Sequence, residues 1–216
     1  GGIRDAINAR LRPLADQWRE VNSGDHVATA RSIMADQIDI LIDLAGQEKG
    51  YPAGDHKHAY QIAHEAFLGK TVHAGEDYGP ESIFQAIGDL HADRIGHGTW
   101  LFSADKIRAR IPNPQAYVDS LVQFIADKRV TLEVCLTSNQ QTVPELAHDL
   151  SKHPFAEMRR KKLSTTFCTD NRLVSNTTVT REILLAAAAF DLRAEEIRDL
   201  LVYGFKTFIY PGKRMR

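Results

Sequence analysis

The sequence lacks the features that mark several classes of protein. It has only two cysteines among 216 residues, and its formal net charge is −1. Two cysteines are too few for a disulfide scaffold, so we expect buried thiols and a reducing compartment, the cytoplasm. The near-neutral charge argues against a nucleic-acid partner, because such proteins normally carry a basic excess. No apolar run reaches the ~18–20 residues that cross a bilayer, so we expect no membrane partner.

The composition that remains is that of a globular protein. Hydrophobic residues make up 43% of the chain and charged residues 25%, which is enough apolar material for one sizeable core. No repeat and no linker rich in proline or glycine interrupts residues 1–216, so we expect a single domain. The basic run Arg159–Lys162 is interpreted as the exposed end of a helix.

Short β-rich runs alternate with helical stretches from about residue 38 onward. The runs are nearly continuous in apolar and β-branched residues, which is typical of buried parallel strands. The predicted strands are Ile38–Ala45, Lys70–His73, Asp93–Gly96, Arg129–Leu136 and Leu163–Thr169. The predicted helices are Arg4–Glu20, His26–Asp36, His56–Leu68 capped by Asp55, Ser82–Leu90, Pro114–Ala126, Thr178–Phe190 and Ala194–Phe208.

This alternation fits either an open doubly wound sheet or part of a (β/α)8 barrel. Each predicted strand ends in a polar or glycine-rich cluster, and barrels gather their chemistry at the carboxyl ends of several strands. We therefore predict an α/β fold of the TIM-barrel type. A full barrel needs about 250 residues and eight strands. Five predicted strands indicate an incomplete barrel.

Four polar residues at these strand ends combine into one chemistry. His73 and Asp170 offer a nitrogen and an oxygen ligand of the kinds that zinc takes. A bound divalent ion lowers the pKa of its water from ~15.7 toward ~7 and so supplies hydroxide at neutral pH. His97 is placed to hold or deprotonate that water, and Glu76 to protonate the substrate as a general acid. The set predicts hydrolytic attack on a carbon beside a protonated heteroatom.

The other histidines are interpreted as structural. The pair in His56-Lys57-His58 has metal-binding spacing, but on a helix that spacing turns the two rings ~200° apart, so we exclude it as the metal site. The remaining histidines fall on helical or loop stretches and are expected at the surface: His26, His64, His91, His148 and His153.

The segments at the strand ends resemble the adenosine deaminase family. The resemblance covers about residues 38–210 and follows the family's order. The combination of HAGE with RIGHG is specific, whereas either motif alone is weak. The matching segments are Asp43-Leu44-Ala45-Gly46, Thr71–Glu76, Arg94–Gly98, Glu133–Asn139 and Cys168–Asn171.

The resemblance implies hydrolysis of adenosine, or of a closely related 6-aminopurine nucleoside, to inosine and ammonia. His73 and Asp170 would be zinc ligands. Glu76 would protonate N1 of the purine, and His97 would orient the hydrolytic water and help to deprotonate it. Gly46 would offer its backbone N–H to N3 of the ring. The partner would be a small-molecule purine nucleoside.

The sequence departs from the family pattern at two places. Asn171 stands where the family often has a second aspartate, and its amide would donate to N7 of the purine. The family also takes two zinc ligands from an H-x-H on its first barrel strand, and no such strand is evident here. We therefore expect strands four to eight of the barrel. We also expect one Zn²⁺ per site, two further histidine ligands on an N-terminal strand missing here, and weak metal binding by this chain alone.

Two alternative functions remain open. A deaminase of adenine, or of another adenine-containing metabolite, would share the residues that bind the purine ring. A non-catalytic purine-binding relative would keep the barrel, but it would have no chemical need for the metal ligands, the acid and the water-orienting histidine together. The sequence leaves the oligomeric state open.

Overall fold

The computed structural model describes residues 42–206, which form an α/β structure around one parallel sheet. The expected helices Arg4–Glu20 and His26–Asp36, the first residues of the expected strand Ile38–Ala45 and the last two of Ala194–Phe208 lie outside the described residues. The five strands are β1 (Ile42–Leu44), β2 (Lys70–Ala74), β3 (Arg94–His97), β4 (Thr131–Val134) and β5 (Thr165–Phe167). The five predicted strands are therefore confirmed, but their bounds differ: β2 runs one residue further than expected, β3 begins and ends one residue later, and β4 and β5 are shorter.

The order of the five described strands bears on the two architectures that the sequence left open. The strands follow one another across the sheet in the order β1-β2-β3-β4-β5, and every neighbouring pair is parallel. A doubly wound sheet reverses its order at a switch point. The described sheet has no such reversal and is singly wound, which is the winding that a (β/α)8 barrel requires.

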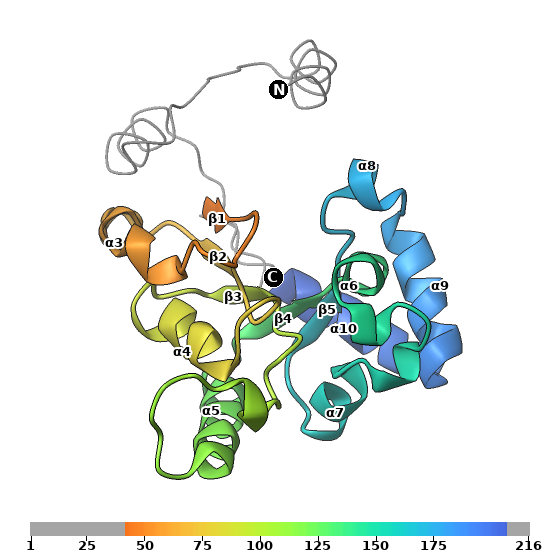
Figure 1. Ribbon diagram of the computed structural model, residues 1–216. Helices are drawn as coiled ribbons and strands as arrows, with labels where there is room; N and C mark the ends of the chain where they lie inside the picture. Colours follow the sequence, from red (N-terminus) through yellow and green to blue (C-terminus); the bar gives the residue numbers. More distant parts are fainter. Residues whose placement is uncertain (1–41, 207–216) are drawn as a thin grey trace.

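Helices connect the strands of the sheet. In Figure 1, α3, α4 and α5 lie around β2 and β3, whereas α6, α7 and α9 lie beside β4 and β5. The α-helices are α3 (Lys57–Glu65), α4 (Pro80–Gly88), α5 (Pro114–Lys128), α6 (Leu136–Thr142), α7 (Phe155–Arg160), α8 (Arg172–Ser175), α9 (Val179–Phe190) and α10 (Ala194–Lys206). The 3-10 helices are η2 (Ala53–His56), η3 (Ala104–Lys106), η4 (Pro144–Leu146) and η5 (Leu150–Lys152).

Local capping explains where several helices begin. Asn113 accepts a hydrogen bond from the N–H of Ala116 at the start of α5, and Thr178 accepts one from Arg181 at the start of α9. These contacts satisfy N–H groups that have no partner inside the helix. The expectation that Asp55 caps a helix is wrong. Asp55 lies within η2, and the chain enters α3 with no side-chain cap hydrogen bond, because η2 leads directly into it.

The two faces of the sheet differ in polarity. Val72, Ile95 and Leu132 are fully buried and lie opposite one another in register on β2, β3 and β4. They belong to the hydrophobic core between the sheet and the helices. Side chains alternate along a strand, so the neighbouring residues face the other side. On that side His73 and Glu133 flank Gly96 in register.

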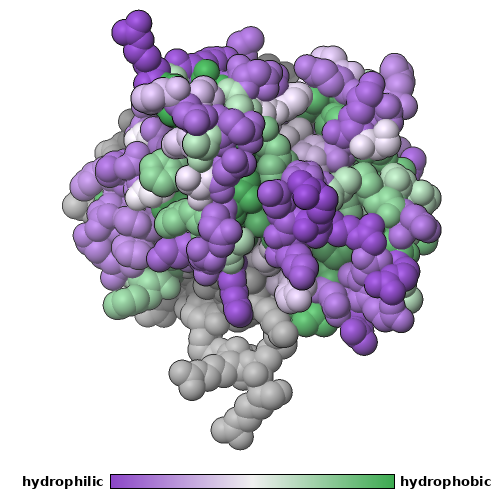
Figure 2. Space-filling view, turned by 90° about the horizontal axis from the view of Figure 1, so that it is seen from below, coloured by the Kyte–Doolittle hydropathy of each residue, from purple (hydrophilic) through white to green (hydrophobic). Residues whose placement is uncertain are grey.

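The surface agrees with the sequence-based expectation at the end of α7. Arg159 and Arg160 form the last turn of α7, and Lys161 and Lys162 are exposed beyond it, so the predicted exposed helix end is confirmed. Figure 2 shows one face of the molecule, on which hydrophilic residues surround smaller apolar patches. Within residues 42–206, no helix is both long and apolar enough to span a bilayer.

The row of apolar residues in the sheet generates a stability prediction. Leu132→Ala leaves a cavity at a fully buried site on β4 and is expected to lower the free energy of unfolding by about 2–5 kcal/mol. Leu184→Ala on α9 removes the same atoms from a side chain that is 65% exposed, and the expected loss is below about 0.5 kcal/mol. Urea denaturation of both variants measures the difference, and equal losses would contradict this description of the core.

Candidate active site

A cavity of about 830 Å³ opens beside the carboxyl ends of the strands. Its volume lies in the range of ~300–1,000 Å³ that is usual for small-molecule sites. His97 does not line the cavity and is only 1% exposed, but it contacts two residues that do. The other predicted site residues all line it: Gly46, His73, Glu76, Asp170 and Asn171.

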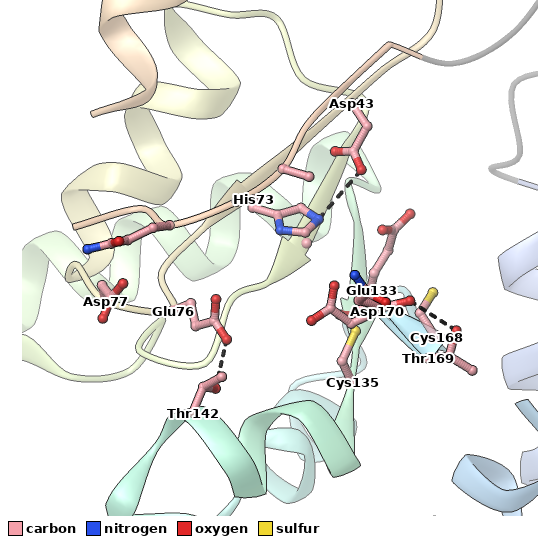
Figure 3. Close-up of a pocket in the computed structure, with 15 residues that line it drawn as sticks. Asp43, His73, Glu76, Asp77, Glu133, Cys135, Thr142, Cys168, Thr169 and Asp170 are labelled. Carbon is pink, nitrogen blue, oxygen red and sulfur yellow. Dashed lines mark hydrogen bonds and ion pairs between the residues drawn. The ribbon is translucent and has the colours of Figure 1, made fainter. Parts of the chain in front are cut away.

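Three side chains in and beside this cavity form a cluster that fits a metal ion. His73 lies on β2, His97 ends β3 and Asp170 follows β5. One ligand atom from each lies within 4.8 Å of the other two. The rings of His73 and His97 meet edge to face, with their centroids 4.9 Å apart. Figure 3 shows His73 of β2, Glu76 of the loop after β2 and Asp170 of the segment after β5 pointing into the same space.

Carboxylates give this space a negative field. Asp43 Oδ2 lies 3.5 Å from His73 Nε2, and Glu133 and Asp170 stand across the cavity. Burial lowers the pKa of His73, but the hydrogen bond and charge of Asp43 and the charges of Asp170 and Glu133 outweigh that effect. The pKa of His73 is therefore raised. A site that favours the cationic form of an imidazole also favours a bound cation.

The backbone around the cluster takes conformations that few residues adopt. His97 has φ 67° and Asp170 has φ 53°, both in the left-handed region that is uncommon for residues with a side chain. Gly96 supplies the space that the ring of His73 needs. A Cβ on Gly96 would lie 2.5 Å from Cδ2 of His73, so any larger residue would displace the ring.

Glu76 is held at the cavity wall by neighbours on both sides. Its Oε1 accepts a hydrogen bond of 2.8 Å from the hydroxyl of Thr142, and its Oε2 lies 3.5 Å from His97 Nε2. Its backbone carbonyl accepts a hydrogen bond of 2.6 Å from the indole N–H of Trp100. The carboxylate is thus directed toward the cluster, as a proton donor or acceptor there would need to be.

A buried carboxylate that sequence reasoning missed holds the loop of Glu76. Glu48 is 6% exposed, and its Oε1 accepts the N–H of Gly75 at 2.9 Å. Its Oε2 accepts the N–H groups of Glu76, Asp77 and Tyr78 at 2.9, 2.7 and 3.2 Å. Four backbone donors on one carboxylate fix the path of this loop. The only signal in the sequence was the position of Glu48 two residues after Gly46.

The expectation that His153 lies at the surface is wrong. The side chain is 2% exposed, because both ring nitrogens have partners inside the protein. Its Nε2 lies 3.1 Å from Asn139 Oδ1, and its Nδ1 accepts a hydrogen bond of 3.0 Å from the N–H of Phe155. Burial lowers the pKa of His153 to about 3. Asn139, which is fully buried, in turn contacts Nδ1 of His97 at 3.1 Å.

The other histidines that were expected at the surface follow that expectation in part. His64 and His148 are exposed, and His91 is half-buried, with its ring stacked on His64. His26 lies outside the described residues. Among residues 42–206, the metal-type cluster includes neither histidine of the pair at positions 56 and 58.

The two cysteines beside the cavity are protonated thiols. Burial, with a further contribution from the nearby carboxylates, raises the pKa of Cys168 to about 12 and that of Cys135 well above its usual range. A neutral thiol is a poor nucleophile. Cys135 is buried as expected, whereas Cys168 is only half-buried.

The fold and this site can be compared with known proteins. The family model for adenosine deaminase matches residues 6–216. The chain belongs to the adenosine deaminase family. An adenosine deaminase of Mycobacteroides abscessus is 33% identical over 202 residues, which are 94% of this chain and 54% of that protein. The chain therefore spans about half the length of the curated relatives that it matches.

Solved structures of family-like enzymes share the fold. An amidohydrolase of Burkholderia ambifaria with bound zinc is similar with a TM-score of 0.73 and 19% identity, over 87% of this chain and 49% of that one. The adenine deaminase of Arthrobacter aurescens is similar with a TM-score of 0.69 and 24% identity, over 84% of this chain and 51% of that one. At these identities the likeness concerns the fold alone.

The buried carboxylate generates a prediction for this adenosine deaminase relative. Glu48→Gln replaces one acceptor oxygen by an NH2 group that faces backbone donors. We expect the free energy of unfolding to fall by about 2–3 kcal/mol, because buried N–H groups lose their acceptor. Amide exchange at residues 75–78 is expected to accelerate.

Glu65→Gln is the matched control, since Glu65 is exposed on α3. Urea denaturation and hydrogen exchange measure both variants. If Glu48→Gln and Glu65→Gln behaved alike, Glu48 would have no structural role in the loop.

Proposed function

We propose that the protein catalyses the hydrolytic deamination of adenosine, or of a closely related 6-aminopurine nucleoside, to inosine and ammonia. The observation that carries this proposal is the cluster of His73, His97 and Asp170, whose ligand atoms lie within 4.8 Å of one another beside Glu76. A metal site next to a carboxylic acid suits hydrolytic attack on a ring carbon whose neighbouring nitrogen is protonated. Membership of the adenosine deaminase family supports the same chemistry.

We propose Zn²⁺ as the cofactor, with one ion at the site and with His73 and Asp170 among its ligands. The imidazole nitrogen and carboxylate oxygen are donor types that zinc takes, and Asp43 and Glu133 add negative charge around them. When bound, the ion would supply a water of lowered pKa. Two ligands are fewer than the three or four protein ligands that zinc usually has. Further ligands, two histidines by family resemblance, would complete the site.

The proposed roles of the other residues follow from their positions. Glu76 would protonate N1 of the purine, held in place by Thr142 and by the Glu48 contacts to its loop. Asn171 would donate to N7, because its Oδ1 already accepts the N–H of Val174 at the start of α8 and its NH2 group is the part that can donate. Gly46, at φ 121° on the cavity rim, would offer its N–H to N3.

We further propose that β1 to β5 are strands four to eight of a (β/α)8 barrel, and that residues 1–216 form part of that single domain. The proposal is supported by the singly wound parallel sheet and by the fold shared with the zinc-containing amidohydrolase. The position of the site residues at the carboxyl ends of the strands also supports it.

Deamination of adenine is the second candidate, because the adenine deaminase of Arthrobacter aurescens shares this fold. The proposed contacts to N1, N3 and N7 serve both substrates. A panel of adenosine, adenine and adenosine monophosphate, assayed for ammonia release with zinc present, separates the candidates. The best substrate is expected to be the nucleoside, and no ammonia from any of them by protein shown to hold zinc would contradict the proposed reaction.

The catalytic assignments predict large losses of activity. Glu76→Gln removes the acid and His97→Ala removes the group beside it, and each variant is expected to lower kcat/KM for adenosine by about 10²–10⁴-fold. The measurement is the initial rate of inosine formation by the zinc-supplemented protein. Glu65→Gln, on the exposed side of α3, is expected to keep full activity. Full activity in both site variants would show that the roles are wrongly assigned.

The metal assignment predicts which histidine binds zinc. The 216-residue chain is expected to bind Zn²⁺ weakly, and His73→Ala is expected to weaken binding further by at least about tenfold. His58→Ala is the control, because His58 is exposed on α3 and lies outside the cluster. Isothermal titration with zinc measures both. A larger loss in His58→Ala than in His73→Ala would place the metal elsewhere.

A further inference from the structure

Behind His97 lies a chain of buried hydrogen bonds that ends on the protein backbone. Nδ1 of His97 is 3.1 Å from Nδ2 of Asn139 on α6. Oδ1 of Asn139 is 3.1 Å from Nε2 of His153, and Nδ1 of His153 accepts the N–H of Phe155. The three side chains are at most 2% exposed, so water does not compete for these contacts.

The backbone end of this chain fixes the direction of every hydrogen bond in it. A backbone N–H can only donate, so Nδ1 of His153 carries a lone pair. The ring is neutral, because burial lowers the pKa of His153 to about 3, and its single proton therefore lies on Nε2. That N–H donates to Oδ1 of Asn139. The amide NH2 of Asn139 then faces Nδ1 of His97, which must accept.

The opposite orientation of Asn139 is disfavoured. Turning the amide by half a turn would place its NH2 group against the Nε2–H of His153. Two donors would then face each other in a fully buried cluster, at a cost of about 1–3 kcal/mol for each group left unsatisfied. Moving the proton of His153 from Nε2 to Nδ1 as well would place its Nδ1–H against the N–H of Phe155. The chain therefore has one self-consistent arrangement.

We propose that Asn139 and His153 are positioning residues that hold neutral His97 as the tautomer protonated on Nε2, so that His97 is a hydrogen-bond donor toward Glu76 and the cavity. The catalytic consequence of this tautomer rests on the proposed function. With its Nε2 lone pair absent, neutral His97 is not a metal ligand, although it lies within the cluster of three. It orients an attacking oxygen by donating to it. This differs from the expectation that His97 helps to deprotonate the water.

The geometry on the cavity side agrees with a donor. Oε2 of Glu76 lies 3.5 Å from Nε2 of His97. In its ionised form, before it takes up the proton that it would give to N1, Glu76 accepts there and does not donate. Thr142 donates to the other oxygen of the same carboxylate, so Glu76 meets donors on both sides. Each group thus donates to the next one, from the backbone N–H of Phe155, through the three buried side chains, to Glu76.

Imidazole nitrogen NMR of the metal-free 216-residue chain tests this inference without any activity. Long-range ¹H–¹⁵N correlation spectra show which nitrogen of each ring is protonated, and His97→Gln and His153→Gln variants assign the two rings. We expect both rings to be protonated on Nε2 and unprotonated on Nδ1. A wild-type spectrum with a proton on Nδ1 of His97 overturns the proposal, whether or not any variant folds.

Asn139→Asp is the decisive variant, since it keeps the shape of the side chain and replaces the donor NH2 by an acceptor oxygen. We expect His97 to gain a proton on Nδ1, while His153 stays protonated on Nε2. Asn176→Asp makes the same chemical change at an exposed position after α8 and is expected to leave both rings unchanged. If Nδ1 of His97 stayed unprotonated in Asn139→Asp, the proposal would be overturned.

The activity assay separates this inference from the proposed function. In the zinc-supplemented protein, Asn139→Asp is expected to lower kcat for adenosine by about 10–100-fold with little change in KM, because the ring is misdirected rather than lost. If the wild type proved inactive with zinc bound while the spectra were as expected, the proposed function would fail and the tautomer would stand. If Asn139→Asp kept full kcat, the positioning role would fail and the deaminase function would stand.

Discussion

The site depends on the parallel register that places Gly96 between His73 and Glu133. This register directs the polar residues of three strands to one face and the apolar row of Val72, Ile95 and Leu132 to the other. A shift by one residue would bury the polar set in the core and expose the apolar one. Because a Cβ at Gly96 would collide with the His73 ring, the same register also requires a residue without a side chain there.

Two buried carboxylates accept backbone N–H groups and so fix the segments that follow β2 and β4. Glu48 binds the loop after β2, and Glu182 of α9 does the same for the segment after β4. Glu182 is fully buried and accepts the N–H of Thr137 at 3.0 Å, as well as the hydroxyls of Thr137 and Thr177. It thereby holds the start of α6, which carries Ser138 and Asn139. Each carboxylate thus accepts donors that would otherwise be left without a partner in the interior of the protein.

The sequence predicted the parts of the structure that depend on local pattern. The strands were recognisable because their β-branched runs end in polar clusters, and the helices α4, α5 and α9 because apolar residues recur at helical spacing. The helices α6 and α8 were missed because they have seven and four residues, too few for a period to appear. The burial of His153 was missed for a different reason. Its partners are Asn139, fourteen residues earlier in the chain, and a backbone N–H, and no local pattern reports such contacts.

The negative field that the carboxylates create in the cavity also bears on which atoms would hold a cation. Cys135 and Cys168 line the cavity beside His73 and Asp170, and thiolates bind zinc well. Burial and the charges of Glu133 and Asp170, however, raise the pKa of both thiols. A thiolate ligand would add a further negative charge to a space that already faces Asp43, Glu133 and Asp170. Neutral imidazole adds none, so the electrostatics of the cavity favour nitrogen and carboxylate ligands over sulfur, in agreement with the geometry of the cluster.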